Sequence, residues 1–217
     1  MSESNSIVFI IDDDAQVRAG LTNLCRSLDL NVQAFSSTDE FLGAERPNMP
    51  ACLVLDVRFP GLSPSGLELQ CKLLEANNPV PIIFITGHPD VPMSVQAMKR
   101  GAVEFLIKPV REQDLLDAIR HGIERDRQQR NQEATRASLC TRFGSLTERE
   151  QEIMCLVAQG LLNKQIAAEL GLSEVTIKTY RGHVMQKMGA KSLAELVRMS
   201  DKIGAASISG TSADTKV

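Results

Sequence analysis

The sequence predicts an α/β domain built on a doubly wound, five-stranded parallel sheet, followed by a smaller all-α domain of four helices. Five short apolar runs occur between residues 7 and 107, and segments with helical periodicity separate them. Such runs are typical of strands in a parallel sheet that helices cover on both faces. Two helical segments joined by a three-residue turn, between residues 163 and 188, predict the all-α domain.

The five expected strands are, in order, IVFII at 7–11, NVQAF at 31–35, ACLVL at 51–55, PIIFIT at 81–86 and EFLI at 104–107. Between the first two strands, apolar residues recur at helical spacing, namely Val17, Leu21, Leu24 and Leu28. With right-handed crossovers this alternation gives five βα units, in which the first and third strands are neighbours.

Changes in composition divide the chain into four parts, 1–122, 123–144, 145–204 and 205–217. After Ile123 the apolar stripe gives way to charge and glutamine, but neither Pro nor Gly follows before residue 144, so a stiff helical linker is expected. A dimerising coiled coil is the alternative for this segment, although no a/d seam continues. The small, polar fourth part is expected to be a disordered tail.

Helix starts in the third part are marked by N-cap candidates, Thr147, Asn163, Ser173 and Ser192. Glu150 and Glu195 follow the first and the last of these at capping-box spacing, and Gly160 and Gly171 suit helix ends. The segments NKQIAAEL and EVTIKTYRGHVMQKM then meet at the turn GLS, which is helix-turn-helix spacing.

The composition is that of an ordinary soluble globular protein, with 43% hydrophobic and 24% charged residues. No apolar run approaches the roughly 20 residues that cross a bilayer. The N-terminal MSESNS does not resemble a signal peptide, so we expect a cytoplasmic protein without a membrane partner. The cysteines are widely spaced without a CxxC pair, which favours small buried thiols over metal ligands or disulfides.

Charge is unevenly distributed along the chain, whose formal net charge is −3. Residues 1–122 carry 10 basic and 16 acidic side chains, a net charge of −6, whereas 123–144 carries +2 and 145–217 carries +1. An acidic first half and a locally basic patch at 171–191 indicate two domains with different partners.

Three aspartates are expected to meet at one edge of the sheet. Asp12 and Asp13 directly follow the first strand, and Asp56 follows the third. Ligands bind beyond the carboxyl ends of such strands, so the three carboxylates should converge. Two of these charges about 4 Å apart repel by roughly 4 kcal/mol, which protons or a hard cation such as Mg²⁺ would relieve. Asp14 is instead expected to begin the next helix.

Thr86 and Lys108 stand at the ends of the fourth and fifth strands and add a hydroxyl and a cation to the same edge. A nucleophilic carboxylate, a metal ion, a hydroxyl and a lysine are the parts of a phosphoryl-transfer site, in which Asp56 accepts the group. For any single acid, a plain solvated sheet edge is the alternative.

The segments IDDDAQVR, CLVLDVRFPG, FITGH and FLIKP resemble the receiver-domain motifs of two-component response regulators, whose fold is flavodoxin-like. The segment LTEREQEIMCLVAQGLLNKQIAAELGLSEVTIKTYRGHVMQKMGAKS resembles the LuxR-type helix-turn-helix domain. Together they resemble the FixJ type over 7–204. The resemblance implies a phosphorylation-dependent, DNA-binding transcriptional regulator rather than an enzyme.

The resemblance also implies roles for individual residues. Asp56 is the phosphoacceptor, and the implied Mg²⁺ ligands are Asp12, Asp13, Asp56 and the main-chain carbonyl of Arg58. Thr86 and Phe105 match the family's switch pair, although Phe105 also suits a plain core position. Lys108 matches the phosphate-binding lysine. One departure is the segment PGLSPSGLEL, two residues longer than the usual PGMSGLEL and with an added Pro64, so the loop over the site is expected to differ.

One side of the expected helix 174–188 should enter the DNA major groove. At 100° per residue its core stripe is Ile177, Tyr180, Val184 and Met188. The opposite side carries Val175, Lys178, Thr179, Gly182 and Gln186. Lys178 can donate to guanine, and Thr179 suits thymine or mixed contacts. A mid-helix glycine costs about 1 kcal/mol, so Gly182 suggests a close approach to DNA, with simple tolerance of a small residue as the alternative.

Phosphate contacts are expected from flanking residues, Arg181, Lys187 and Lys191, with Asn163 and Lys164 at the start of the preceding helix. The expected partners are double-stranded promoter DNA and, by the resemblance, a cognate sensor histidine kinase. RNA polymerase is a further candidate partner. Phosphorylation is expected to change the face around 91–123 and to favour either dimerisation or release of the DNA-binding half. A homodimer is expected because one small module seldom gives enough specificity.

Two rival functions stay open. A Mg²⁺-dependent phosphatase with an aspartyl-phosphate intermediate would use similar chemistry, but such enzymes generally carry a second acid at the position of Arg58. The other rival is a DNA-binding protein whose receiver-like half mediates assembly without being phosphorylated.

Overall fold

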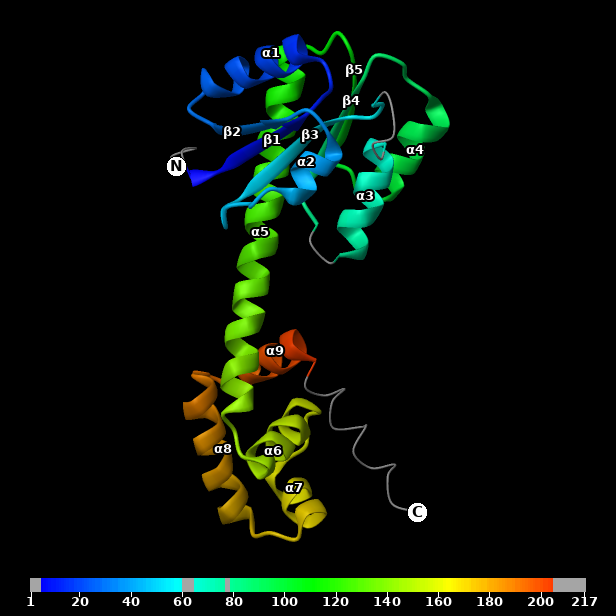
Figure 1. The fold of residues 1–217 in the computed structure, drawn as a ribbon. Helices are drawn as coiled ribbons and strands as arrows, with labels where there is room; N and C mark the ends of the chain where they lie inside the picture. The colour runs from blue at the N-terminus through cyan, green and yellow to red at the C-terminus, as the bar shows by residue number, and fades with distance from the viewer. Residues whose placement is uncertain (1–4, 60–64, 77–78, 205–217) are drawn as a thin grey trace. The chain divides into compact units, whose positions relative to one another are not determined.

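The computed structural model describes residues 5–59, 65–76 and 79–204 (Figure 1). The chain forms two compact units, Met1–Arg130 and Asn131–Val217. The division lies beyond the linker start expected at residue 123. The expected tail at 205–217 and the added Pro64 both fall outside the described residues.

The first unit contains the predicted parallel sheet. Its strands are β1 (Ile7–Ile11), β2 (Asn31–Phe35), β3 (Ala51–Asp56), β4 (Ile82–Thr86) and β5 (Glu104–Ile107). Their order in the sheet is β2-β1-β3-β4-β5, and all pairs are parallel. Ile11 lies opposite Leu55 in this register, so the residues that follow β1 and β3 leave the sheet side by side. The predicted strands and the pairing of the first with the third are confirmed.

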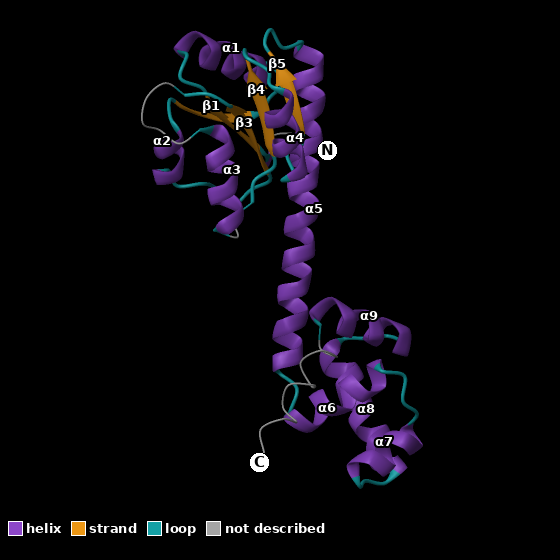
Figure 2. Cartoon of the chain, turned by 90° about the vertical axis from the view of Figure 1, so that its right-hand side faces the viewer, coloured by secondary structure: helices purple, strands orange, loops and turns teal. Residues whose placement is uncertain are grey.

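Helices cover both faces of this sheet (Figures 1 and 2). They are α1 (Ala15–Arg26), α2 (Thr38–Gly43), α3 (Gly66–Glu75), α4 (Val91–Lys99) and α5 (Glu112–Gly144). Because side chains alternate along a strand, Phe9 and Leu53 pack with α2, α3 and α4, whereas Ile10 and Val54 pack with α1 and α5. Asp14 caps α1 as expected, accepting hydrogen bonds from the main-chain N–H groups of Gln16 and Val17.

The second unit joins the end of α5 to four helices. They are α6 (Glu148–Ala158), α7 (Asn163–Leu170), α8 (Glu174–Met188) and α9 (Leu193–Ile203). Their buried core includes Leu139 from α5, Ile153 from α6, Ile166 from α7 and Val184 from α8. The four helices and the three-residue turn before α8 are as predicted.

Three of the four predicted N-caps of this unit are confirmed, Thr147, Ser173 and Ser192, and one, Asn163, is wrong. Thr147 forms a full capping box with Glu150, and Ser173 caps α8. The N-cap of α7 is Leu162 rather than Asn163, and the Gln165 side chain binds the Leu162 N–H. Ser192 accepts from the Glu195 N–H, but the Glu195 carboxylate reaches the N–H of Lys191, so only half of the second capping box forms.

Among the helices that the structure describes, none is both long enough and apolar enough to cross a membrane.

Candidate functional site

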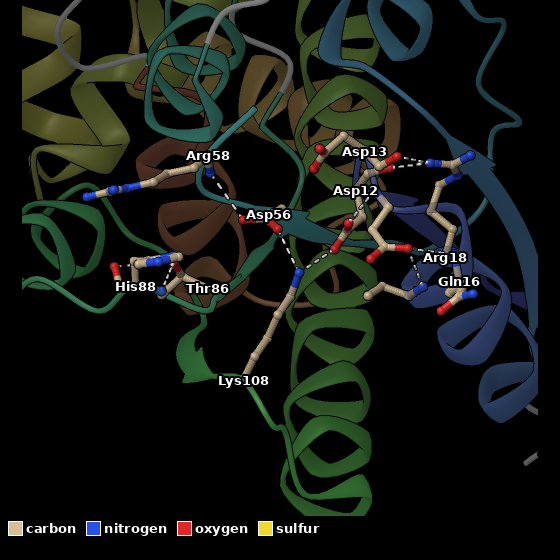
Figure 3. A network of polar contacts seen from close by, with 11 residues as sticks. Asp12, Asp13, Gln16, Arg18, Asp56, Arg58, Thr86, His88 and Lys108 are labelled. Carbon is tan, nitrogen blue, oxygen red and sulfur yellow. Dashed lines mark hydrogen bonds and ion pairs between the residues drawn. The ribbon is translucent and has the colours of Figure 1, made fainter. Parts of the chain in front are cut away.

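The three aspartates meet where β1 and β3 end (Figure 3). Asp12, Asp13 and Asp56 each place one carboxylate oxygen within 4.8 Å of the others. Asp12 is fully buried and Asp56 is 8% exposed, whereas Asp13 is exposed. The topology therefore brings together the acids that the strand ends predicted.

Lys108, which follows β5, reaches across to two of these acids. Its Nζ lies 2.6 Å from Asp12 Oδ2 and 2.7 Å from Asp56 Oδ2. Burial lowers the pKa of Lys108, but the hydrogen bonds to both carboxylates outweigh it, and the pKa is raised. Burial raises the pKa of Asp12, and Lys108 offsets that effect only in part. The lysine thus relieves the repulsion that the sequence implied.

The main chain of the acidic turns is held by Arg18, a residue that the sequence reasoning did not single out. Its Nη1 donates to the main-chain oxygens of Asp12, at 2.7 Å, and of Asp13, at 2.9 Å. The residue lies on α1, one helical turn after the cap Asp14. Its place in the segment IDDDAQVR was the available clue.

Gly66 sets the distance between β3 and α3. A Cβ on this residue would lie 2.4 Å from the main-chain oxygen of Asp56, and the Gly66 N–H donates to Val57 O at 3.0 Å. Only glycine allows this approach of the two backbones. On the other side, Asp56 Oδ1 accepts from the Arg58 N–H at 3.1 Å. The carboxylate of Asp56 is consequently fixed in direction.

The expected switch residues lie on the neighbouring strands β4 and β5. Thr86 is buried, and its hydroxyl accepts from the His88 N–H at 3.2 Å and donates to His88 O at 3.4 Å (Figure 3). Phe105 is half-buried, with its ring centroid 6.1 Å from that of Phe84.

The donor set of the acidic edge suits a hard cation. Three carboxylates supply oxygen ligands only, which Mg²⁺ prefers to nitrogen or sulfur. Lys108 already bridges two of the acids, so the edge attracts positive charge. Receiver sites of this composition generally bind Mg²⁺. The main chain of Arg58 contributes its N–H group here, which donates a hydrogen bond to Asp56 Oδ1.

The second candidate surface is the outer side of α8. The five residues predicted to face DNA are all exposed: Val175, Lys178, Thr179, Gly182 and Gln186. Ile177, Val184 and Met188 are buried, and Tyr180 is half-buried against the same core. The helical period therefore assigned the two sides correctly. A Cβ on Gly182 would meet nothing within 4 Å, so packing inside this unit does not require the glycine.

The flanking cations are partly engaged within the protein. Lys187 binds the buried carboxylate of Glu150 at 2.6 Å, and Arg181 binds the side chain of Asn163. Lys191 and Lys164 are exposed. Arg142, from the end of α5, donates to the last carbonyl of α8, Met188 O, at 2.9 Å. These bonds fix α8 to three other helices, which the sequence reasoning missed because the partners lie far apart along the chain.

Two family models match the chain. A response regulator receiver domain matches residues 8–120, and the family of bacterial regulatory proteins of the luxR type matches residues 144–200. The first contains the acidic edge and the second contains α6, α7 and α8.

Relatives of known role align over most of their length. Nodulation protein W of Bradyrhizobium diazoefficiens is 55% identical over 94% of this chain and 88% of its own. The transcriptional regulatory protein FixJ of Azorhizobium caulinodans is 42% identical over 92% of this chain and 93% of its own. The solved response regulator StyR is 48% identical, with a TM-score of 0.79 over 91% of this chain and 99% of that chain. The chain therefore belongs to the FixJ-type response regulators of two-component systems, DNA-binding transcriptional regulators in which a receiver domain precedes a LuxR-type domain.

Proposed function

We propose that Asp56 accepts a phosphoryl group from a phosphohistidine of a sensor histidine kinase, and that this modification controls binding to promoter DNA. The observation that carries the proposal is the convergence of Asp12, Asp13 and Asp56, with Lys108 bound to two of them. A regulator that meets both a kinase and promoter DNA works in the cytoplasm.

The acidic edge would hold Mg²⁺ through Asp12, Asp13, Asp56 and the main-chain carbonyl of Arg58. When bound, the ion supplies positive charge that offsets the charge of the incoming phosphoryl group. Asp56 presents its carboxylate as the nucleophile, in the direction set by the Arg58 N–H and Lys108. Before the transfer, the Lys108 ammonium binds the negative carboxylate of Asp56. After the transfer, it would bind the negative phosphoryl oxygens instead.

Thr86 and Phe105 would carry the change away from the acceptor. The Thr86 hydroxyl bonds the main chain of His88, and it can turn toward a phosphoryl oxygen. Phe105 is only half-buried, so it has room to pack deeper when β4 shifts. Phosphorylation would thereby shift an equilibrium that already exists.

Dimerisation of the phosphorylated protein is proposed on the face around 91–123. Four large apolar side chains on α4 and β5 are exposed there, Val91, Val95, Met98 and Ile107. Val91 is 75% exposed, and clustered apolar side chains of this kind are typical of protein interfaces. A homodimer would place two copies of α8 on one DNA site and raise specificity.

On the DNA, α8 would read bases through Lys178 and Thr179, with Val175, Gly182 and Gln186 beside them. Arg181, Lys187, Lys191, Asn163 and Lys164 would lie along the phosphates, where contacts position the helix without reading sequence. Lys178→Ala should then weaken specific binding by about 1–3 kcal/mol. An equal loss on all sequences would contradict base reading. RNA polymerase is the proposed further partner at the promoter.

Acetyl phosphate with Mg²⁺ tests the acceptor directly. Intact-protein mass spectrometry should show one added phosphoryl group on the wild-type chain and none on Asp56→Asn. Absence of labelling on the wild type would support the rival in which the first unit mediates only assembly. Release of many phosphates per protein from small phosphoesters would instead support the phosphatase rival.

A further inference from the structure

Helix α5 spans the segment between the two regions that the family models match. The receiver model ends at residue 120 and the luxR-type model begins at residue 144, whereas α5 runs through Glu112–Gly144. Its buried positions in the first unit follow helical spacing, with Leu115, Ile119 and Ile123. The next position of this stripe is Asp126, and its exposed fraction is only 3%. A carboxylate therefore stands where an apolar residue would be expected.

One carboxylate oxygen of Asp126 accepts two hydrogen bonds at this buried position. Its Oδ2 accepts from the main-chain N–H of Ala51 at 2.8 Å and from Nε of Arg130 at 2.6 Å. Arg130 Nη1 in turn donates to Asn48 Oδ1 at 2.7 Å. The carboxylate thus joins α5 to the loop before β3 and to the first residue of β3 itself. Asp56, the proposed acceptor, is the last residue of the same strand.

The backbone of α5 at Gly122 also lies very close to the side chain of Cys52 on β3. A Cβ on Gly122 would lie 2.7 Å from Cys52 Sγ. Ile119 and Ile123 pack in one cluster with Cys52 and Val54 of β3. If α5 moved along β3, a buried N–H and a buried carboxylate would lose their partners, and both losses are costly. The helix is therefore anchored to the acceptor strand as far as Arg130.

After Arg130 the character of the helix changes. Every side chain from residue 131 to residue 138 is exposed, and Leu139 is the next buried one. Leu139 belongs to the core of the second unit. The two compact units also divide between Arg130 and Asn131. Asp126 and Arg130 accordingly form the last anchor of α5 on the receiver.

We propose that Asp126 is a positioning residue that fastens the root of the connecting helix to the acceptor strand, so that a change at Asp56 is passed to the DNA-binding unit. This rests on the proposed function of Asp56. A coupling path needs an element that moves as one piece with the site where the change begins. With the anchor broken, α5 gains a flexible joint at its root, and part of the change is absorbed there.

The test uses the full-length chain and a matched control on the same helix. Asp126→Ala removes the anchor. Glu124→Ala removes an exposed carboxylate whose bonds to Arg127 and Gln128 stay within the helix. For each variant, phosphorylation is measured by intact mass. DNA affinity is measured with and without beryllofluoride, on a duplex selected by the wild-type protein from random sequence.

Asp126→Ala should be phosphorylated to the wild-type extent, but the gain in DNA affinity with beryllofluoride should be about fivefold smaller than in the wild type. Glu124→Ala should keep the wild-type gain. A merely structural role would lower stability without changing this ratio at a temperature where all variants are folded. An undiminished gain in folded Asp126→Ala would overturn the proposal.

A second variant covers the case in which Asp126→Ala does not fold. Arg130→Gln keeps the bond between Asp126 and Ala51 but removes the charged partner, and its gain should be about twofold smaller. Amide hydrogen exchange separates this proposal from the proposed function, because it needs no phosphorylation. Peptides covering 124–130 should exchange about tenfold faster in either Asp126→Ala or Arg130→Gln than in Glu124→Ala, and equal rates would overturn the anchor.

Discussion

The two functional surfaces of this protein are built in different ways. The acidic edge lies at the ends of buried strands, and the order of the sheet decides which side chains meet there. The side of α8 proposed to face DNA is exposed, and its direction depends on bonds from α8 to α5, α6 and α7. A site placed by sheet topology is fixed by the fold itself, whereas a helix face needs additional partners to fix its rotation.

A lysine bound to a buried carboxylate occurs on both surfaces, and the comparison shows two uses of one interaction. Lys108 binds two carboxylates and stands within the proposed phosphoryl-transfer site. Lys187 binds Glu150, which also caps α6, and so holds α8 in place. Substitutions of the two lysines should therefore have different consequences.

The largest effect is expected from Lys108→Met, because it leaves two buried carboxylates without their shared cation. The free energy of unfolding of the first unit should fall by about 2–3 kcal/mol, and Mg²⁺ should restore more stability to this variant than to the wild type. Urea unfolding followed by far-UV circular dichroism measures both quantities. Lys72→Met, at an exposed lysine on α3, is the control. Equal effects of Mg²⁺ on the stability of the variant and the wild type would show that the charge of Lys108 does not offset the repulsion between the carboxylates of the metal site.

A smaller effect is expected from Lys187→Met, about 1.5 kcal/mol in the second unit, because Glu150 loses a charged partner. Tyr180 is the only tyrosine in a chain without tryptophan, so tyrosine fluorescence during urea unfolding reports on this unit alone. Lys191→Met should leave stability unchanged but lower the salt dependence of DNA binding by about one phosphate contact. If Lys191→Met destabilises the unit as much as Lys187→Met, the distinction between the two lysines is wrong.

The same pair predicts a pH dependence of the second unit. The hydrogen bond from Lys187, followed by that from the Thr147 N–H, holds the pKa of Glu150 below its ordinary value. Glu150 therefore contributes stability that is present above the ordinary pKa and is lost as pH falls through the lowered value. The urea midpoint from tyrosine fluorescence should decrease below about pH 5. Glu150→Gln should flatten that decrease, and an unchanged pH profile in this variant would contradict the assignment.

The smallest effect is expected from Gly182→Ala. Nothing in the second unit occupies the space of a Cβ there, so alanine should stabilise α8 by up to about 1 kcal/mol while weakening DNA binding. Gly20→Ala in α1 is the matched control, because Gly20 also has open space around a Cβ. It should stabilise the first unit and leave DNA affinity unchanged. Unweakened DNA binding by Gly182→Ala would favour simple tolerance of a small residue.

Much of this fold was predictable because it depends on local pattern. Short apolar runs gave the strands, and the order of elements placed Asp12 beside Asp56. The helical period likewise separated Lys178 from the core residue Ile177. These predictions use spacing within one element or the general rules of parallel sheets.

The unpredicted features depend on contacts between distant residues. Glu150 and Lys187 are 37 positions apart, and Asp126 and Ala51 are 75 apart. In a helical pattern a carboxylate such as Asp126 indicates a solvated position, and only the tertiary structure shows its burial. The N-cap of α7 was misplaced because Leu162 offers no capping side chain, so the polar residue after it was the better candidate.

The central claim is that occupation of Asp56 changes DNA binding, and fluorescence anisotropy with the full-length chain tests it most directly. A selected DNA duplex is titrated with wild-type protein and with Asp56→Asn, with and without beryllofluoride and Mg²⁺. We predict that beryllofluoride tightens wild-type binding by about tenfold or more and leaves Asp56→Asn unchanged. Equal affinity of the wild-type protein under both conditions, or an equal gain in Asp56→Asn, would contradict the account.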